Sequence, residues 1–264
     1  MMIFCLSDHR LNSYMSIINS RSTCLLIILI AFAISGFSQT KAPGTAVADS
    51  KTAAVNVSLP SDLAKAAVAA HGGDKLRQVK SIVMKGSVDF NVSGVSTPAT
   101  FSIAISGDKY FFEINNPVQP LKQTYDGRQT FSTIRGFSLP PITSLGFPVL
   151  TRIGETGYVV SEIGESKKKR KGFRVTTPDG YYTDFLIDDK TGQVKGYESS
   201  YEVGERNVTT SVEIDEFQTI DGVLMPKKYS QRIDLGQLTA YASFKVKEML
   251  INSTIDDSVF AMPK

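Results

Sequence analysis

Few residues of this chain have the types and spacing that chemistry requires. The chain holds two histidines and two cysteines, and only His71 follows residue 38. Nucleophilic hydrolysis needs a serine or cysteine beside a base, and no G-x-S-x-G sequence occurs. His71 stands directly before Gly72 and Gly73, where a helix is expected to end and where an imidazole favours the negative end of the helix dipole. We therefore predict a structural role for His71, with catalysis as the minor alternative, and no enzyme activity.

Two acidic pairs could in principle bind a hard cation such as Ca²⁺. Asp188 and Asp189 enter an expected turn, whereas Asp256 and Asp257 begin an expected helical turn that runs to Phe260. These local roles favour structure over ligation, so we predict no metal site. No P-loop or G-x-G-x-x-G sequence is present, and no cofactor is predicted.

A basic run, Lys167 to Lys171, lies between two expected strands. Most such runs are solvated hairpin tips, and the alternative is docking to anionic headgroups or to an acidic partner. The chain as a whole has 29 basic and 26 acidic residues. This near balance gives no reason to expect a nucleic-acid partner.

The N-terminal residues predict export. An apolar stretch, CLLIILIAFAISGF at 24–37, follows Arg21 and precedes Ser38. It is shorter than the roughly 20 apolar residues of a membrane-spanning helix, and basic, apolar and small residues follow one another as in a secretory leader. We predict a signal peptide over 1–38, a flexible tether over 39–58, one domain over 59–264 and a periplasmic location. An uncleaved signal anchor is the alternative.

The domain begins with helix and continues as strand. Leu63, Ala66, Ala67 and Ala70 follow helical spacing after Pro60, and a second short helical turn is expected over Asp74–Val79. From Ser81 onward the apolar period changes to two, and short turns rich in Gly, Asp and Pro separate the runs, which predicts an antiparallel meander. The expected strands are Val88–Val92, Phe101–Ile105, Tyr110–Ile114, Gln129–Ile134, Gly157–Ile163, Gly172–Thr177, Tyr181–Asp188, Val194–Val203, Thr209–Phe217, Pro226–Asp234 and Leu238–Leu250.

One apolar loop interrupts this rhythm. The segment 136–152, GFSLPPITSLGFPVLTR, combines three prolines with seven large apolar residues. A loop this apolar must cover something or be covered itself. Ile142–Leu145 is expected to form a helical turn after Pro140 and Pro141. Two interpretations of Phe137–Leu150 stay open, ordinary core and a mobile lid.

Three short motifs support a resemblance to a known family. They are HGG at 71–73, FLIDDKTGQV at 185–194 and DGV-x-x-P at 221–226. With the early Ala-rich helix and the long meander, they make residues 60–264 similar to the LolA-like outer-membrane lipoprotein-sorting family, whose wider group includes LolB, the LppX and LprG lipid carriers and the sensor domain of RseB. The resemblance implies a half-barrel whose concave face is capped by helices around an apolar cavity. It also implies an arginine that latches a helical lid, for which Arg135 and Arg152 are the candidates.

The sequence therefore predicts a mainly β fold, a large antiparallel half-barrel of about eleven strands with one or two short helices capping the concave face. The predicted function is non-catalytic binding or transport of a lipid, acyl chain or lipidated protein. The alternatives are a lipid-sensing or scaffold module with a membrane or envelope partner, and a filled structural barrel. A slip of one residue would exchange the two faces. The predicted ligand-binding residues are Phe90, Phe101, Ile103, Ile105, Phe112, Ile114, Phe131, Phe147, Leu150 and Phe185.

Overall fold

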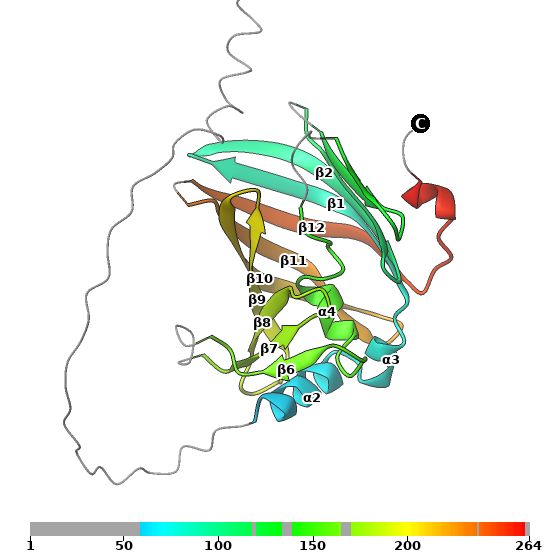
Figure 1. Ribbon diagram of the computed structural model, residues 1–264, viewed down its shortest axis with the longest axis vertical. Coiled ribbons are helices and arrows are strands. Elements are labelled where there is room, and N and C mark those ends of the chain that lie inside the picture. Colours follow the sequence, from blue (N-terminus) through cyan, green and yellow to red (C-terminus); the bar gives the residue numbers. More distant parts are fainter. Residues whose placement is uncertain (1–58, 118–119, 134–138, 165–169, 237, 262–264) are drawn as a thin grey trace, which may run out of the picture. The chain divides into compact units, whose positions relative to one another are not determined.

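The computed structural model describes residues 59–117, 120–133, 139–164, 170–236 and 238–261 (Figure 1). These residues all belong to one unit, Asn56–Lys264. The predicted leader and tether, Arg135, and Lys167 to Lys169 of the basic run lie outside the described residues. Within the described part of the chain, no helix has the length and apolar character needed to cross a membrane.

The described residues form one antiparallel sheet of twelve strands, which confirms the mainly β prediction (Figure 1). Its strand order is β5-β4-β3-β2-β1-β12-β11-β10-β9-β8-β7-β6, and the two edge strands do not pair, so the sheet is not closed. The strands are β1 (Ser81–Val92), β2 (Val95–Ser106), β3 (Lys109–Asn115), β4 (Leu121–Tyr125), β5 (Thr130–Ser132), β6 (Val159–Ser161), β7 (Gly172–Thr176), β8 (Tyr182–Ile187), β9 (Val194–Val203), β10 (Arg206–Ile220), β11 (Val223–Asp234) and β12 (Thr239–Ile251).

The sheet consists of two meanders rather than one. Strands β1 to β5 pair in chain order, as do β6 to β12, and pairing of β1 with β12 joins the two sets. Because β5 and β6 occupy opposite edges, the chain between them has to travel from one edge of the sheet to the other. The prediction of a continuous meander is therefore wrong at this one connection, and β4 is the strand that the sequence did not reveal.

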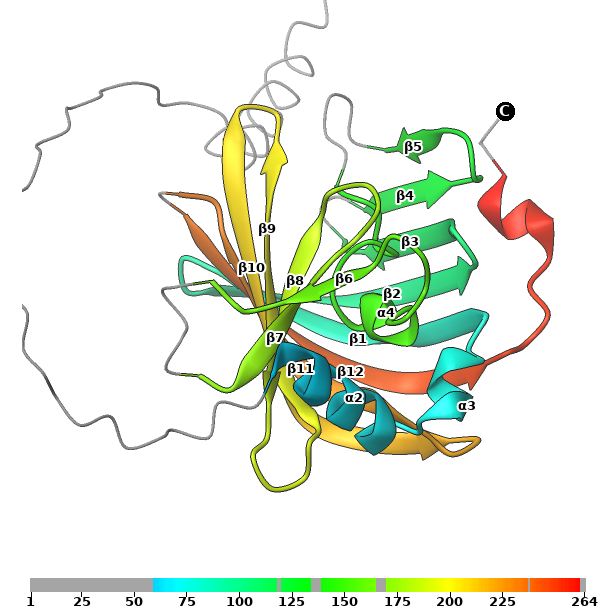
Figure 2. The same ribbon diagram turned by 60° about the horizontal axis from the view of Figure 1, so that its bottom comes forward.

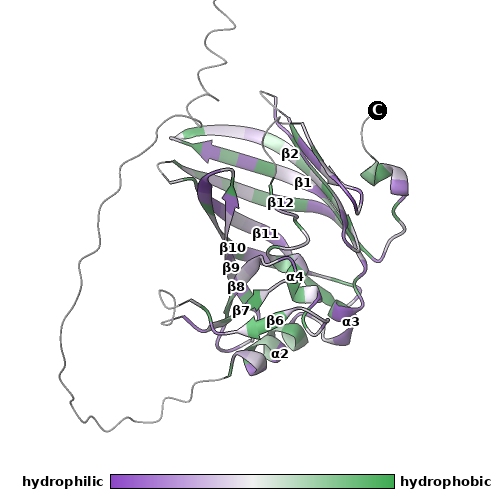
Figure 3. Ribbon diagram, in the orientation of Figure 1, coloured by the Kyte–Doolittle hydropathy of each residue, from purple (hydrophilic) through white to green (hydrophobic). Residues whose placement is uncertain are grey.

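The strand register divides the side chains between two faces. Directly paired residues of an antiparallel sheet lie on the same face. Phe101 pairs with Ile114 and Gly86, and the same logic carried across the sheet places Phe185 on that face too. We call it the inner face, because the segment after β5 packs against it. Hydropathy alternates along the strands, as expected when one face is buried and the other is solvated (Figure 3).

Short helices lie beside this sheet. Helix α2 (Pro60–Ala70) packs against β6 and β7, and its buried Ala64 and Ala67 allow a close approach (Figure 2). Helix α3 (Asp74–Arg77) follows at once, as predicted. The 3₁₀ helix η2 (Asp257–Phe260) also agrees with the prediction, and the Asp256 side chain caps it by accepting from the Ser258 N–H.

The predicted helical turn over Ile142–Leu145 is displaced. The structure has a single hydrogen-bonded turn there, from the Ser144 N–H to the Pro141 carbonyl, and the helix α4 comes later (Phe147–Thr151). Gly146 explains the delay, because its φ of +65° turns the chain before the helix begins. Pro148 then occupies the first turn, where its missing N–H has no cost.

The β1–β12 pairing that joins the two meanders contains a bulge next to Gly86. A Cβ added at Gly86 would lie 2.1 Å from the Lys245 carbonyl oxygen and 2.7 Å from the Phe101 ring. Only a glycine fits at this position, because backbone atoms of the neighbouring strand cannot move away cheaply.

We expect Gly86→Ala to lower the free energy of unfolding by about 3 kcal/mol, since the added methyl group must push two strands apart. Urea unfolding followed by far-UV circular dichroism measures the change. Ser87→Ala on the same strand is the control and should change stability by less than about 1 kcal/mol. Equal stability of the Gly86→Ala variant and the unmodified protein would contradict the assigned bulge.

Candidate functional site

The crossover, residues 139–158, is the element that occupies the inner face. It connects the two sheet edges and contains α4, which lies on the inner side of the sheet in both ribbon views (Figures 1 and 2). Polar contacts with both meanders hold it in place from its beginning to its end.

The buried side chain of Gln123 on β4 fixes the start of the crossover. Its Nε2 donates to the Leu139 carbonyl at 2.8 Å, and its Oε1 accepts from the Leu139 N–H at 2.8 Å. The same Nε2 also donates to the Tyr110 hydroxyl at 2.7 Å. The amide therefore pairs with one residue of the crossover as a neighbouring strand would, and it satisfies both backbone groups of that residue.

The middle of the crossover is held by the second meander. The Ser144 hydroxyl donates to Asp179 at 2.6 Å, and the Gly146 N–H donates to the Thr183 hydroxyl at 3.0 Å. A Cβ at Gly146 would meet the Tyr197 ring at 2.6 Å, so the backbone lies directly on that ring. Burial raises the pKa of Tyr197 to about 12, and a hydrogen bond with the Phe147 backbone opposes part of the rise.

Arg152 holds the end of α4. Its guanidinium donates to Asp108 at 2.7 Å and to Glu155 at 2.8 Å, and it lies 4.9 Å from the centre of the Tyr158 ring. Partial burial works to lower the pKa of Arg152, but the two carboxylates outweigh it and raise that pKa. Asp108 belongs to the β2–β3 turn, so Arg152 ties α4 to the first meander. Of the two arginines that are candidates for latching a lid, Arg152 is the one that lies within the described residues.

The apolar residues of the crossover belong to the hydrophobic core. Phe147, Val149 and Leu150 are buried, and they form one cluster with α2 and the inner faces of both meanders. This packing is expected both of ordinary core and of a closed lid, so the two interpretations of the loop both stay open.

His71 is a buried junction between α2 and the second meander. Its Nδ1 lies 2.8 Å from the Leu224 carbonyl, and its Nε2 accepts from the Val194 N–H at 3.0 Å. Both contacts are satisfied together only by the neutral ring with its proton on Nδ1. Burial lowers the pKa of His71, against the Leu224 hydrogen bond, which raises it. The ring also meets Phe147 of α4 edge-on at 5.2 Å.

The structure brings nine of the ten predicted ligand-binding residues to the inner side and leaves one elsewhere. Phe131 pairs with Thr124, and Thr124 pairs with Phe111 on the outer face. The expectation that Phe131 points inward is therefore wrong, and the cause is a shift of one residue in the face assigned to β5. The buried members of the set are Phe101, Ile105, Ile114, Phe147, Leu150 and Phe185, and the half-buried inner members are Phe90, Ile103 and Phe112.

An aromatic row crosses four neighbouring strands on the inner face. It consists of Phe101, Phe90, Phe244 and Tyr229. The Phe244 ring centre lies 5.3 Å from that of Phe101, 6.5 Å from that of Phe90 and 4.7 Å from that of Tyr229, with which it stacks. Phe101 and Phe244 are buried, whereas Phe90 and Tyr229 are half-buried. The row therefore presents partly exposed rings beside the crossover.

Sequence reasoning missed Gln123, Tyr197, Phe244 and Tyr229. Leu121, Gln123 and Tyr125 do alternate, but a five-residue strand with a polar residue at its centre gives a weak signal. Phe244 and Tyr229 lie at alternating positions of strands that were predicted correctly. Their inward direction follows only from pairing with residues far away in the chain.

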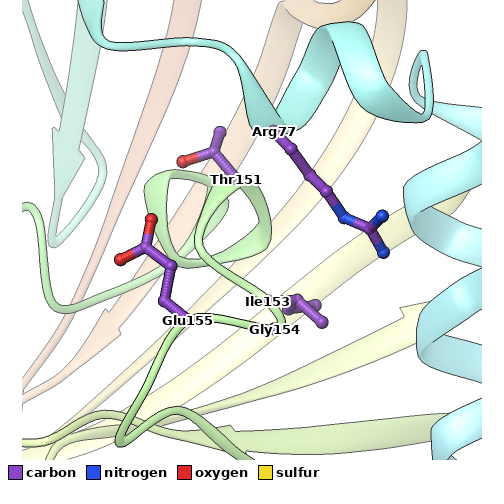
Figure 4. A pocket seen from close by; sticks show the side chains of 5 residues that line it. All are labelled: Arg77, Thr151, Ile153, Gly154 and Glu155. Carbon is purple, nitrogen blue, oxygen red and sulfur yellow. The ribbon is translucent and has the colours of Figure 1, made fainter.

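Two open hollows in the described part of the chain have mixed polar and apolar linings. One, of about 390 Å³, lies between α3 and the turn after α4 and is lined by Arg77, Thr151, Ile153, Gly154 and Glu155 (Figure 4). Arg77 already pairs with Asp74 at 3.5 Å, and Glu155 pairs with Arg152. The second, of about 630 Å³, lies between the start of β1 and the residues after β12. Neither hollow holds the grouping of nucleophile and base that hydrolysis requires.

The acidic pairs have local partners, and the described residues contain no group of three or more side chains suited to a metal ion. Asp188 accepts from the backbone N–H groups of Lys190 and Thr191 and pairs with Lys195 at 2.9 Å. Asp257 pairs with Lys109 at 2.8 Å. Of the basic run, the structure describes Arg170 and Lys171, which are exposed.

The sequence matches no protein-family model and no curated protein. Solved structures similar to this chain include a LolA superfamily protein from Nitrosomonas europaea, which is 13% identical with a TM-score of 0.48 and covers 78% of this chain and 98% of its own. A DUF1329 family protein from Desulfovibrio piger is 11% identical with a TM-score of 0.45, covering 76% and 96%. A putative outer membrane lipoprotein-sorting protein domain from Vibrio parahaemolyticus is 10% identical with a TM-score of 0.42, covering 75% and 97%. Two of these three neighbours carry the names of the group that the sequence resembles, and at such identities the likeness concerns the fold alone.

Replacing Gln123 tests the anchor of the crossover. We expect Gln123→Leu to reduce the free energy of unfolding by about 2–4 kcal/mol, because the Leu139 N–H and carbonyl lose their partner in a buried place. Urea unfolding measures the loss, with the exposed Gln129→Leu as a matched control. Equal stability of the two variants would show that the crossover is held without this amide.

His71 should make the free energy of unfolding depend on pH between pH 7 and pH 5, where the carboxyl groups contribute little to the change. Its pKa is lowered in the folded protein, so the unfolded chain, with a pKa of about 6.5, binds more protons as the pH falls. Stability is complete above that value and should decrease from pH 7 to pH 5. The carboxyl groups with lowered pKa, such as Glu216 at about 2, act only below about pH 4.5.

We expect His71→Gln to be about 1–3 kcal/mol less stable at pH 7.5 but to lack most of the decrease between pH 7 and pH 5. Urea unfolding at pH 7.5, 6.5 and 5.5 gives both quantities. An identical pH dependence in the variant and the unmodified protein would refute the role assigned to this imidazole.

Proposed function

We propose that the chain is an exported, non-catalytic binder of a lipid, acyl chain or lipidated protein, which it holds against the inner face of the open sheet. One observation carries this proposal. The crossover covers only part of the inner face, and the aromatic row includes the half-buried rings of Phe90 and Tyr229. Half-buried Ile103, Phe112 and Ile214 continue this apolar surface.

The charge distribution supports a hydrocarbon ligand. Every inward-facing residue of β1, β2 and β3 is uncharged by the register, and the same holds for Ala240, Ala242 and Phe244 of β12. The outward-facing residues of the same strands include Lys85, Asp89 and other charged side chains. Transfer of methylene groups from water to a surface of this kind is favourable, and the surface has no charged group that could stabilise an ion.

The expected strength of binding suits capture and release. Each methylene group removed from water contributes about 0.8 kcal/mol, so ten of them contribute about 8 kcal/mol. This corresponds to a dissociation constant near the micromolar range before the cost of ordering the ligand is subtracted. A complex of this strength can both form and release its ligand.

The location follows from the predicted leader. A chain exported by residues 1–38 and left soluble by cleavage would work in the periplasm, where acyl chains and lipidated proteins must cross an aqueous space. Non-catalytic binding is consistent with the partners found for His71, Asp188 and Glu155, each of which is engaged in a structural contact.

A scaffold or lipid-sensing module that signals to a membrane partner is the second candidate. The packed crossover favours it, because the chain's own Phe147, Val149 and Leu150 occupy part of the apolar inner face. The deciding experiment is mass spectrometry of an organic extract from the purified protein. Copurified lipid supports the binder, whereas a lipid-free protein that copurifies with an inner-membrane protein supports the scaffold.

Two half-buried phenylalanines on opposite faces provide a matched test. We expect Phe90→Ser to weaken binding of a fluorescent fatty-acid probe about tenfold, because it removes apolar surface from the inner face. Phe131→Ser removes the same group from the outer face and should leave probe affinity unchanged. Fluorescence titration measures both, after circular dichroism has shown that each variant is folded. Equal losses in the two variants would contradict binding on the inner face.

A further inference from the structure

Gln231 is a polar side chain placed inside an apolar surface. It lies on β11 opposite Ala242 of β12 and Val212 of β10, both of which are buried on the inner face. The next inward residues on its own strand are Tyr229, from the aromatic row, and Ile233. Gln231 thus occupies the inner face beside the aromatic row, two strands away from Phe90 or about 10 Å.

Gln231 is half-buried as a residue, its amide atoms reach solvent, and no described residue forms a hydrogen bond with them. Two other pairs of polar groups on this side of the inner face satisfy each other. The Thr183 hydroxyl contacts Ser199 at 3.0 Å, and the Tyr201 hydroxyl contacts Thr210 at 3.0 Å. A solvent-accessible amide is satisfied by water, and a ligand that displaces this water has to replace its hydrogen bonds.

The surroundings of Gln231 determine which ligand group it can accept. The inward residues from Tyr229 to Ile233, from Val208 to Ile214 and from Ala240 to Phe244 are all uncharged by the register. A carboxylate or phosphate placed here would lie in apolar surroundings without a cation. Arg206, an inward-side cation at the tip of β10, precedes Val212 by six residues, or about 20 Å of extended strand. An amide, in contrast, can donate to a carbonyl and accept from a hydroxyl.

We propose that Gln231 is a specificity-determining residue that binds the uncharged polar head of an acyl lipid, through an ester or amide carbonyl or a hydroxyl, while the hydrocarbon lies along the aromatic row. This inference rests on the proposed function and deepens it. It restricts the ligand class to acyl esters, acyl amides or glycerides and disfavours free fatty acids and other anionic lipids.

The test compares two lipids with the same hydrocarbon, 1-monooleoylglycerol and oleate, at pH 8, where oleate is ionised. Displacement of a fluorescent acyl probe from the full chain gives both affinities. We expect the unmodified protein to prefer monooleoylglycerol about tenfold or more, Gln231→Leu to lose about tenfold in affinity for monooleoylglycerol alone, and Gln231→Asn to retain part of the preference. The Asn variant keeps the test valid if the Leu variant does not fold.

The outcomes separate the two proposals. If the unmodified protein binds both lipids equally, or if Gln231→Leu leaves its preference intact, the role of Gln231 is overturned while lipid binding stands. If the unmodified protein binds neither lipid, the proposed function fails and the inference fails with it.

Discussion

The pairing of β1 with β12 is the constraint on which the rest of the structure depends. It places the first meander beside the last strand of the second, so β5 and β6 become the two edges of one sheet. The chain between them then has to pass over a face of the sheet, and its apolar composition directs it to the face that excludes water. The crossover is thus a topological consequence of a single strand pairing, and it doubles as core material for a sheet too wide to be covered by α2 alone.

This arrangement explains why the crossover carries so many specific polar contacts. A segment that crosses a sheet face without joining the sheet cannot use ladder hydrogen bonds for its own backbone groups. Gln123 on β4 and Thr183 on β8 supply partners instead, and Arg152 of the crossover ties it to the β2–β3 turn through Asp108. Gly146 allows the chain to lie flat on Tyr197. The part of the inner face beyond these anchors stays partly exposed, and it is there that the aromatic row and Gln231 lie together.

Local sequence patterns were sufficient to predict most helices and strands. Spacing, turn residues and caps within a dozen positions indicate α2, α3, η2 and the long strands. The failures share a physical origin in long-range pairing. Phe131 was assigned to the wrong face because β5 has three residues and its register depends on Thr124 of the preceding strand. Gln123 was missed because its role depends on Leu139, across a loop. The inward direction of Gln231 likewise depends on Ala242 and Val212, which no local window contains.

The pairing of Ile82 with Ile251 also determines when the native state can form. These residues stand near opposite ends of the domain, so closing that contact requires nearly the whole polypeptide and has a large entropic cost. A chain that is still emerging from a ribosome or a translocation channel lacks β12, and its first meander has an unpaired apolar edge until the C-terminal strand arrives. Newly made chains should therefore need protection from self-association until synthesis is complete, and shortening the C-terminus should damage folding far more than its length suggests.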